Sequence, residues 1–265
     1  MNESRKLDQF YTKKAVAENF YNILNKKYNL KEYKLIEPSA GTGSFSSLFH
    51  KNSIALDLDP KSDEIIKQDF LNFDGTELSK DNVFVVGNPP FGKNSSLAIK
   101  FFNKSAEFAD YIAFILPQTF KKESVINKLN INFHLVNEII LQKNSFEFNN
   151  EDYDVPCVFQ VWEKRKIKRE NINSMKKSKL FNFVKKSDAD FAIRRVGGLA
   201  GKVILDFESY KEPSHYYIKV NTQEIGINEL INKLISIYPD LQRLARYSAG
   251  NPSLSKGELI RELEK

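Results

Sequence analysis

The sequence predicts an α/β fold, in which a doubly wound, mostly parallel seven-stranded sheet precedes a smaller C-terminal α+β part. Three observations predict it. Apolar segments alternate with segments of helical period over roughly the first 163 residues, as in strands joined by helical crossovers. Several apolar segments are almost continuously apolar, which is typical of strands covered on both faces. After Trp162 the composition becomes basic and the apolar period is lost.

The elements of the first part follow this alternation. The predicted strands cover residues 33–38, 53–59, 64–70, 82–87, 111–117, 134–141 and 155–162. Helical segments are predicted at 13–28, 43–50, 95–108 and 119–130. A long polar loop without helical period joins the last two strands. It therefore predicts an antiparallel pair at a sheet edge and not another crossover.

The C-terminal part follows a basic segment that lacks apolar period. We place the domain boundary near 164–170 and take residues 1–165 and 166–265 as the two domains. The strand-like pieces of the second domain cover residues 180–184, 190–196, 202–207 and 215–220, and a helical pattern fills 223–248. Its last segment begins at Ser255, and Glu258 three residues later predicts a capping box.

The composition narrows the class of protein. Hydrophobic residues make up 41% and charged residues 28%, an ordinary balance for a soluble chain. No apolar run could span a bilayer, and the N-terminus lacks the apolar core of a signal peptide, so the expected location is the cytoplasm, with no membrane partner. One cysteine and three histidines provide neither a disulfide framework nor an ordinary Cys/His zinc site, so no metal is expected.

The net charge of +6 favours a polyanionic partner. A lysine-rich hydrated surface explains the same charge without any partner. Charge alone therefore leaves the two interpretations open.

The turn after the first strand of the predicted sheet is rich in glycine. Gly41 and Gly43 let the backbone approach a ligand at the carboxyl edge of the sheet. A dinucleotide fingerprint would have a third glycine where Ser46 stands. Glu37, just before the turn, would repel a pyrophosphate and attract an ammonium group. The turn therefore favours a cationic, nucleoside-like ligand.

Acidic residues also end the next two strands. Asp57 lies twenty residues after Glu37, where an acid can accept hydrogen bonds from a ribose diol. Asp69 could accept from an adenine amino group, with Phe70 packing nearby. Aspartate and glycine are common in ordinary strand-end turns, so each residue alone is a weak signal. The three acidic strand ends together are a stronger one.

The fourth strand ends on the corner Asn-Pro-Pro-Phe-Gly, residues 88–92. The two prolines fix φ and remove two backbone donors, so the carbonyl of Pro89 becomes an acceptor on a stiff corner. The side-chain oxygen of Asn88 is a second acceptor. Two neighbouring acceptors suit an amino group with two N–H donors, and Phe91 offers a flat face to its planar carrier. A simple proline turn at a strand end is the alternative.

These motifs resemble those of the class I S-adenosylmethionine-dependent methyltransferases, specifically the N6-adenine DNA methyltransferases. Motif IV of that family, Asn/Asp-Pro-Pro-aromatic, corresponds to residues 88–91. Residues 37–45 (EPSAGTGSF) match motif I, 56–60 match motif II and 68–70 match motif III. The resemblance covers roughly residues 8–163 and does not extend to 164–265.

The N-terminal residues 8–20 are similar to the stretch that precedes motif I in the gamma order of these motifs. Lys13 stands there in place of the usual proline. The form of motif I together with this N-terminal stretch favours adenine in DNA as the acceptor. RNA adenine methyltransferases and, less closely, glutamine N5-methyltransferases carry similar Asn-Pro-Pro-aromatic motifs. A non-catalytic nucleic-acid-binding subunit is a further alternative.

The resemblance implies a Rossmann-like sheet, S-adenosylmethionine as the cofactor, and a target base that is flipped out of the duplex, as in restriction–modification and other DNA adenine methylation. The implied catalytic residues are Asn88, Pro89, Pro90 and Phe91. The implied cofactor-binding residues are Tyr11, Thr12, Glu37, Pro38, Ala40, Gly41, Gly43, Asp57, Leu58, Asp69, Phe70 and Asn88. Phe91 would stack on the base, and a second aromatic would come from Phe146 or Phe148, with Tyr153 as a further candidate.

The C-terminal domain stands where such enzymes recognise their target. Arg194 and Arg195 precede a glycine turn, and Lys202 follows it. Arginines on a loop can read guanine edges or hold phosphates, whereas a hydrated hairpin explains the same charges equally well. The predicted partner is therefore DNA, with RNA as the alternative, and the small size of this domain leaves room for a second subunit.

Overall fold

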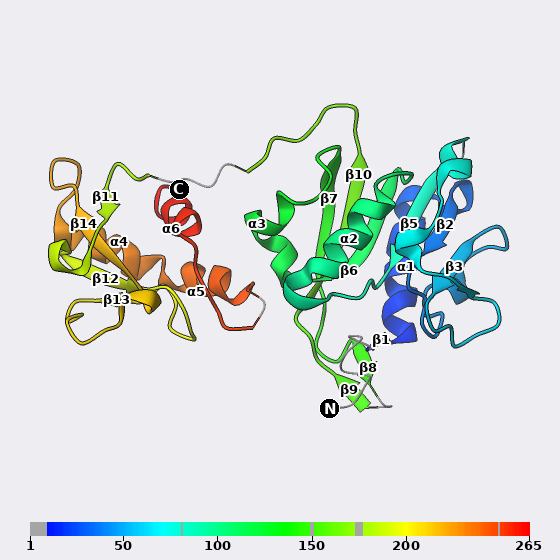
Figure 1. Ribbon diagram of the computed structural model, residues 1–265, viewed down its shortest axis with the longest axis horizontal. Coiled ribbons are helices and arrows are strands. Elements are labelled where there is room, and N and C mark those ends of the chain that lie inside the picture. Colours follow the sequence, from blue (N-terminus) through cyan, green and yellow to red (C-terminus); the bar gives the residue numbers. More distant parts are fainter. Residues whose placement is uncertain (1–9, 81, 149–150, 173–176, 249) are drawn as a thin grey trace. The chain divides into compact units, whose positions relative to one another are not determined.

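The computed structural model in Figure 1 describes residues 10–80, 82–148, 151–172, 177–248 and 250–265. It divides into two compact units. Unit 1 comprises Met1–Phe120 and Ser124–Asn171, and unit 2 comprises Lys121–Glu123 and Ile172–Lys265. Within the described ranges no helix is long and apolar enough to cross a membrane.

Unit 1 is built on a seven-stranded sheet with the order β4-β3-β2-β5-β6-β10-β7 (Figure 1). The strands are β2 (Lys34–Glu37), β3 (Ile54–Asp57), β4 (Ile66–Lys67), β5 (Val83–Gly87), β6 (Tyr111–Pro117), β7 (Phe133–Ile140) and β10 (Cys157–Lys164). They run parallel except β10, which is antiparallel to both β6 and β7. The predicted α/β class with a mostly parallel seven-stranded sheet is confirmed. The expected antiparallel pair is present, with β7 as the edge strand.

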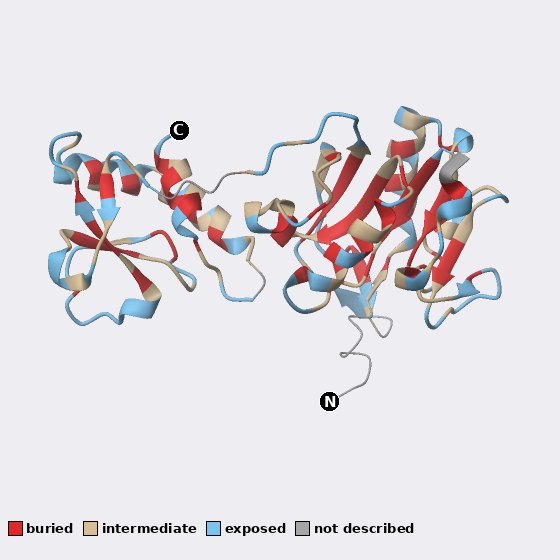
Figure 2. Cartoon of the chain, turned by 45° about the horizontal axis from the view of Figure 1, so that its top comes forward, coloured by how far each residue is buried: buried red, intermediate tan, exposed pale blue. Residues whose placement is uncertain are grey.

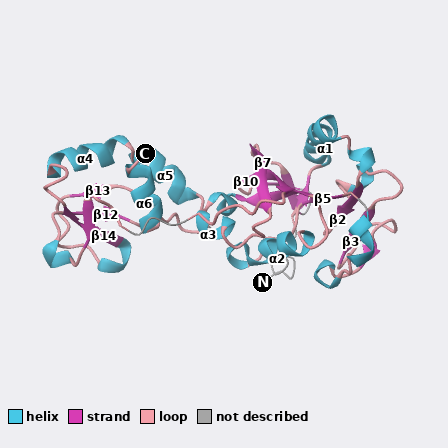
Figure 3. Ribbon diagram, turned by 90° about the horizontal axis from the view of Figure 1, so that it is seen from above, coloured by secondary structure: helices cyan, strands magenta, loops and turns pink. Residues whose placement is uncertain are grey.

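Helices cover both faces of this sheet. α1 (Lys14–Tyr28) lies on one face and α2 (Ser96–Ser105) on the other (Figure 3). Phe20 of α1 stacks on Phe159 of β10 with ring centroids 4.1 Å apart, and Phe102 of α2 meets Trp162 edge-on at 5.4 Å. The central strands are accordingly buried along most of their length (Figure 2). This two-sided burial is why their sequences are continuously apolar.

Three predicted elements are shorter than expected. The helix predicted at 43–50 is a single 3₁₀ turn, Ser46–Leu48, because the short segment after the glycine turn must return at once to the start of β3. The helix predicted at 119–130 is reduced to a 3₁₀ turn, Gln118–Lys121, and the short α3 (Glu123–Ile126). The strand predicted at 64–70 pairs only at Ile66–Lys67, since Asp69 already caps the next turn.

A second, three-stranded sheet was not predicted from the sequence. It joins β1 (Tyr11–Thr12) to the hairpin of β8 (Phe146–Phe148) and β9 (Glu151–Tyr153), which lies in the polar loop between β7 and β10. Thr12 pairs with Phe146 in an antiparallel register. The N–H of Lys13 also donates to the carbonyl of Ser145 at 3.1 Å. A proline could not make this bond, so the departure from the family pattern at Lys13 adds a link to the hairpin.

Unit 2 is an α+β structure. Its four-stranded antiparallel sheet has the order β11-β14-β12-β13, formed by β11 (Phe181–Phe183), β12 (Phe191–Arg194), β13 (Val203–Ile204) and β14 (His215–Val220). The helices α4 (Ile227–Ser236), α5 (Tyr238–Arg246) and α6 (Lys256–Leu263) cover one face of it (Figure 3). Residues 173–176 of the basic segment lie outside the described residues.

The helices of unit 2 refine the sequence prediction. The pattern expected at 223–248 is two helices, because Pro239 near the start of α5 cannot continue α4. The capping box at Ser255 and Glu258 is confirmed, since each side chain accepts from the backbone N–H of the other residue. The buried core of this unit includes Phe191, Ile218 and Leu230.

Candidate active site

A cavity of about 230 Å³ opens at the carboxyl ends of β2, β3 and β5. Most of the residues that the sequence singled out line it. They are Tyr11, Thr12, Glu37, Pro38, Ala40, Gly41, Asp57, Leu58, Asp69, Phe70, Asn88, Pro89 and Pro90. The parallel sheet therefore brings together residues that are far apart in the chain, as strand ends at one edge should be.

Gly41 forms the floor of this cavity at a position where only glycine fits. Its φ is +54°, and a Cβ there would lie 2.7 Å from Cε1 of Tyr11. Its N–H donates to the carboxylate of Asp57 at 2.7 Å, and the N–H of Asp59 donates to the other oxygen at 2.8 Å. Asp57 thus fixes the glycine turn while it faces the cavity.

Glu37 is the most deeply buried acid of the cavity, with 2% of its surface exposed. One carboxylate oxygen accepts from the N–H of Ser46 at 2.7 Å. The pKa of Glu37 is raised to about 8, mainly because the carboxylate is buried and to a lesser extent because of the nearby charge of Asp57, while the hydrogen bonds from Ser46 act in the opposite direction. A cationic group beside Glu37 would offset this cost of burial, so the position suits an ammonium ligand.

Asp69 lines the cavity with both carboxylate oxygens engaged. One accepts from the N–H of Leu71 and the other from the side-chain amide of Asn72, each at 2.9 Å. Phe70 beside it is almost fully buried. The predicted contact of Asp69 with an adenine edge would use the remaining lone pairs, and it stays a prediction.

Asn88 forms the corner after β5. Its carbonyl accepts from the hydroxyl of Ser39 at 3.0 Å, which ties this corner to the glycine turn after β2. Its side-chain Oδ1 is buried and has no hydrogen-bond partner among the described residues. Such an atom is costly to bury unpaired, and here it belongs to a residue that lines the cavity.

The chain beyond Phe91 turns back sharply to enter α2. Gly92 has φ +67°, and a Cβ there would lie 2.7 Å from Cβ of Leu97. Asn94 and Ser95 also have positive φ, at 54° and 62°. Consecutive left-handed residues other than glycine store strain, and such strain is found where surrounding packing enforces a functional geometry.

The aromatic residues that were predicted to stack on the acceptor do not all face the cavity. Phe91 is 8% exposed and Phe146 is 1% exposed, and neither lines the cavity. Phe10 covers both, with its ring centroid 5.2 Å from that of Phe91 and 4.9 Å from that of Phe146, each pair edge-on. Tyr153, which is 43% exposed, lies 5.6 Å from Phe10 on another side. Phe148 packs against Tyr153 and not against Phe91.

Several lining residues were missed by the sequence reading. Phe10, Ser39, Ser44, Gln68 and Asp59 all contribute to the cavity. Phe10 and Ser39 stand inside the N-terminal motif and motif I, next to residues of the predicted site, so these motifs are the sequence signal that points to them. Gly43 was expected in the floor, but it lines a separate hollow behind the turn. Asp8 and Gln9 of the N-terminal motif lie outside the described residues.

The predicted acceptor-binding cations lie in unit 2 at the end of β12. Arg194 donates through Nε to the carbonyl of Val196 at 2.9 Å, and Arg195 donates to the carbonyl of Pro213 at 3.2 Å. Lys202 is exposed. Across the part of the chain that the structure describes, no group of three or more His, Cys, Asp or Glu residues is arranged to hold a metal ion.

The sheet defines the class of the fold. Numbered in chain order, the strands of unit 1 run 3-2-1-4-5-7-6 across the sheet with the seventh antiparallel, which is the arrangement of class I methyltransferases. Unit 1 therefore has the class I S-adenosylmethionine-dependent methyltransferase fold, with its cavity at the carboxyl edge of the sheet.

Comparison with known proteins adds fold neighbours. No protein-family model matches the sequence, and no curated protein matches it. A candidate RNA methyltransferase from Pyrococcus horikoshii is 17% identical with a TM-score of 0.49, covering 60% of this chain and 88% of its own. A candidate class I S-adenosylmethionine-dependent methyltransferase from Listeria monocytogenes is 15% identical with a TM-score of 0.46, covering 63% and 64%.

The 23S rRNA methyltransferase ErmE is 12% identical with a TM-score of 0.42, covering 60% of this chain and 71% of its own. All three similarities extend over less than two thirds of this chain. At these identities they describe a resemblance of fold, so activity has to be argued from the residues of the cavity.

Proposed function

We propose that the chain is an S-adenosylmethionine-dependent methyltransferase that transfers a methyl group to the N6 amino group of adenine in DNA. The observation that carries this proposal is Oδ1 of Asn88, a buried acceptor of a cavity-lining residue that has no partner in the part of the chain that the structure describes. An amino group with two N–H donors would satisfy this atom together with the carbonyl of Pro89. An ordinary proline turn gives no reason to keep that oxygen unpaired.

The cavity residues fit S-adenosylmethionine. Glu37 suits the ammonium group, and Asp57 suits the ribose diol. Thr12 suits the methionine carboxylate, because its Oγ1 is buried, lines the cavity and has no partner among the described residues. Gly41 lets the ring of Tyr11, another lining residue, lie directly against the glycine turn, because a Cβ there would lie 2.7 Å from Cε1 of Tyr11. When bound, the cofactor supplies an electrophilic methyl group.

The residues of the corner would act by positioning. Asn88 Oδ1 and the carbonyl of Pro89 accept from the amino group of the acceptor, which orients its lone pair and concentrates electron density on the nitrogen. Ser39 holds the carbonyl of Asn88, so the corner is oriented before the acceptor arrives. Preorganised polar groups of this kind account for much of the rate enhancement in many enzymes. The proton leaves to solvent, since the corner contains no general base.

A purine in a duplex is inaccessible to a corner of this kind, so the base would be flipped out of the stack. The form of motif I (EPSAGTGSF, residues 37–45) and the N-terminal Gln-Phe-Tyr-Thr stretch favour DNA adenine over the other acceptors. Methyl transfer to RNA adenine is the alternative. Unit 2, with its excess of basic residues, is the part that we propose for target recognition.

The test is transfer of tritiated methyl from S-adenosylmethionine to duplex DNA, to RNA and to protein in parallel, followed by nucleoside analysis. N6-methyladenine from DNA is the expected product. Asn88→Ala protein serves as the control for contaminating activity. Label confined to RNA, N4-methylcytosine as the product, or label in glutamine would each overturn the acceptor assignment. Absence of transfer to all of them, by protein that binds the cofactor, would favour a non-catalytic subunit.

A further inference from the structure

Residues near the ends of three strands of unit 2 lie close together in its sheet. β11 and β12 are both antiparallel to β14, and Arg194 of β12 lies beside His215, the first residue of β14, whereas Phe183 of β11 lies beside Ile218, the fourth. Phe183 ends β11, Arg194 ends β12, and Tyr216 is the second residue of β14. The chain after Ser253 returns to the same place, because the N–H of Leu254 donates to the carbonyl of Arg195 at 2.9 Å.

Two cations at this edge lie over two aromatic rings. Lys256, the first residue of α6, has its Nζ 4.5 Å from the ring centroid of Phe183 and 5.9 Å from that of Tyr216. The guanidinium of Arg195 lies 5.5 Å from the ring centroid of Tyr216. Phe183 and Tyr216 also contact each other edge-on at 5.2 Å. We call these four residues the strand-end cluster.

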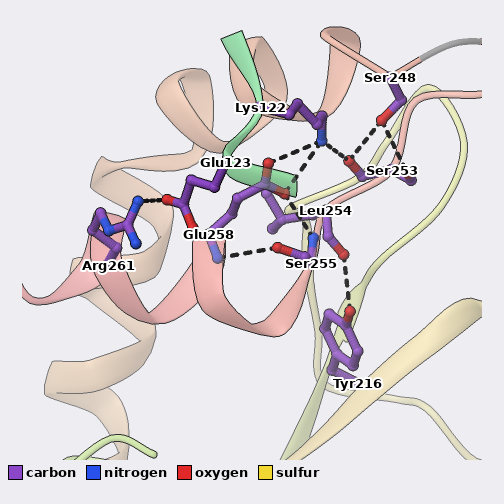
Figure 4. Close-up of polar contacts among 9 residues, drawn as sticks. All are labelled: Lys122, Glu123, Tyr216, Ser248, Ser253, Leu254, Ser255, Glu258 and Arg261. Carbon is purple, nitrogen blue, oxygen red and sulfur yellow. Dashed lines mark hydrogen bonds and ion pairs between the residues drawn. The ribbon is translucent and has the colours of Figure 1, made fainter. Parts of the chain in front are cut away.

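A hydrogen bond and a ring contact hold the two rings of the cluster in place. The hydroxyl of Tyr216 donates to the carbonyl of Leu254 at 2.9 Å, a contact drawn in Figure 4. Phe183 packs edge-on against the buried Phe181 at 5.2 Å. The cations therefore rest on a rigid surface, which reduces the conformational entropy that they would lose on binding an anion.

Neither cation has a carboxylate partner in the described ranges. Glu258, two residues after Lys256, already has other partners (Figure 4). Its carboxylate accepts from the N–H of Ser255, and the Nζ of Lys122 lies 3.1 Å from its Oε1. The side chain of Arg195 donates through Nη1 to the carbonyl of Pro213, and its Nε is buried without a partner among the described residues. The cluster is thus a pair of positive charges that no carboxylate of the described residues pairs with.

The charge of the whole chain is concentrated in the same unit. Residues 172–265 contain sixteen lysines and arginines against eleven aspartates and glutamates, so they carry five of the six net positive charges. A positive field of this kind attracts polyanions over distances of a Debye length, about 8–10 Å at physiological salt.

We propose that the strand-end cluster binds the phosphodiester backbone of the nucleic acid on which the enzyme acts. This inference rests on the proposed function for the identity of the polyanion. The cluster differs from the cations predicted from the sequence. It keeps Arg195 and adds Lys256 and the two rings. Arg194 is not part of it, because its side chain donates to the carbonyl of Val196 in its own turn. Phosphate contacts of this kind position a protein on its target without reading the base sequence.

The test is binding of the full chain to a short fluorescein-labelled DNA duplex and to the matching RNA, followed by anisotropy at several salt concentrations. The variant is Arg195→Ala with Lys256→Ala. The control is Lys219→Ala with Lys233→Ala, which removes the same charge from near the end of β14 and from α4. Circular dichroism of each protein checks that unit 2 remains folded.

We expect the cluster variant to bind every sequence more weakly and to lower the slope of log K against log salt by about 2, since each phosphate contact contributes about 1. The control should change the slope less. Phe183→Leu, which keeps both charges but removes the ring under Lys256, should weaken binding by about two- to fivefold. Competition by poly-glutamate as strong as that by unlabelled DNA would overturn the assignment of a nucleic-acid site.

The two proposals can fail separately. Protein that binds DNA or RNA with the expected slope but transfers no methyl group would leave the strand-end cluster in place and remove the methyltransferase assignment. Protein that methylates DNA while the cluster variant and its control bind with equal slopes would remove the cluster. Absence of any nucleic-acid binding by the wild-type chain would also remove it.

Discussion

The two sides of the cavity in unit 1 differ in how complete they are. On the side proposed for the cofactor, Glu37, Asp57 and Asp69 already accept hydrogen bonds from backbone N–H groups, at distances of 2.7–2.9 Å. On the side proposed for the acceptor, Oδ1 of Asn88 has no partner in the described residues, and Phe10 covers Phe91. The three acids of one side are therefore fixed by the fold, whereas the Asn88 oxygen of the other side is left for the acceptor that we propose.

This difference has a physical origin. The carboxylates stand at strand ends whose turns present N–H groups to them, so the same hydrogen bonds stabilise the turn and orient the acid. The acceptor side is made by a corner whose two prolines have no backbone N–H and by aromatic side chains from separate segments. Those segments meet through the small β1-β8-β9 sheet, so their arrangement depends on long-range pairing.

Asn88→Ala should give the largest effect and should act on the acceptor side alone. We expect the rate of methyl transfer in a single turnover to fall by about 10²–10³-fold, as when one preorganised polar group is removed. Cofactor affinity, measured by calorimetric titration, should hardly change. Asn88→Asp, which keeps an acceptor oxygen, should retain more activity than Asn88→Ala. Transfer by Asn88→Ala at the wild-type rate would mean that the corner is only a strand end.

Asp57→Ala should have the next largest effect and should act on the cofactor side. The change removes a charged acceptor and leaves the N–H groups of Gly41 and Asp59 unpaired, so affinity for S-adenosylmethionine should fall by about 10- to 100-fold. Asp74→Ala is the matched control, because Asp74 also accepts a backbone N–H, from Thr76, but does not line the cavity. Equal cofactor affinities of the two variants would remove Asp57 from the site.

Glu37 should make the stability of the cofactor-free protein depend on pH. Its pKa in the folded chain, about 8, is above the ordinary value of 4.5, so the folded state holds an extra proton between these values. The stability that Glu37 contributes is therefore present below pH 4.5 and is lost as the pH rises toward 8, with a slope of up to about 1.4 kcal/mol per pH unit.

The free energy of unfolding is measured at each pH by denaturant titration. Unfolding is followed by the fluorescence of Trp162, the single tryptophan of the sequence and a buried residue of unit 1. Glu37→Gln should lose the pH dependence and should be more stable than the wild type at pH 8. The same slope in both proteins would show that Glu37 is ionised in the folded chain throughout.

Substitution of Phe10 should give the smallest effect. Whether it strengthens or weakens binding of the base shows whether Phe10 covers Phe91 or forms part of the stacking surface. A base that stacks on Phe91 has to replace the edge-on contact of Phe10, which is worth about 0.5–1.5 kcal/mol. Phe10→Ala should therefore strengthen binding of an oligonucleotide with 2-aminopurine at the target position, by about two- to tenfold. The affinity of the Phe10→Leu protein should lie between those of the wild type and the Phe10→Ala protein. Weaker binding, as expected for Phe91→Ala, would make Phe10 part of the stacking wall.

The sequence by itself determined the sheet and the cofactor side of the cavity. Continuous apolar strands predicted burial on both faces, and Glu37, Gly41, Asp57 and Asp69 could be read from strand ends because parallel strands end at a common edge. The capping box that begins at Ser255 was predicted from the sequence in the same way. Each of these signals is contained in one strand and the turn that ends it, or in one helix start, so the local sequence is enough to predict it.

The tertiary structure decided what depends on pairing between distant segments. It shortened the crossover after Gly43 to one turn, because the chain had to return at once to β3. It paired Thr12 with Phe146, which placed Phe10 over Phe91. It also brought Lys256 from the start of α6 onto the ring of Phe183. No periodicity or motif links such residues, because the contacts form only after the sheets have set the register of their strands.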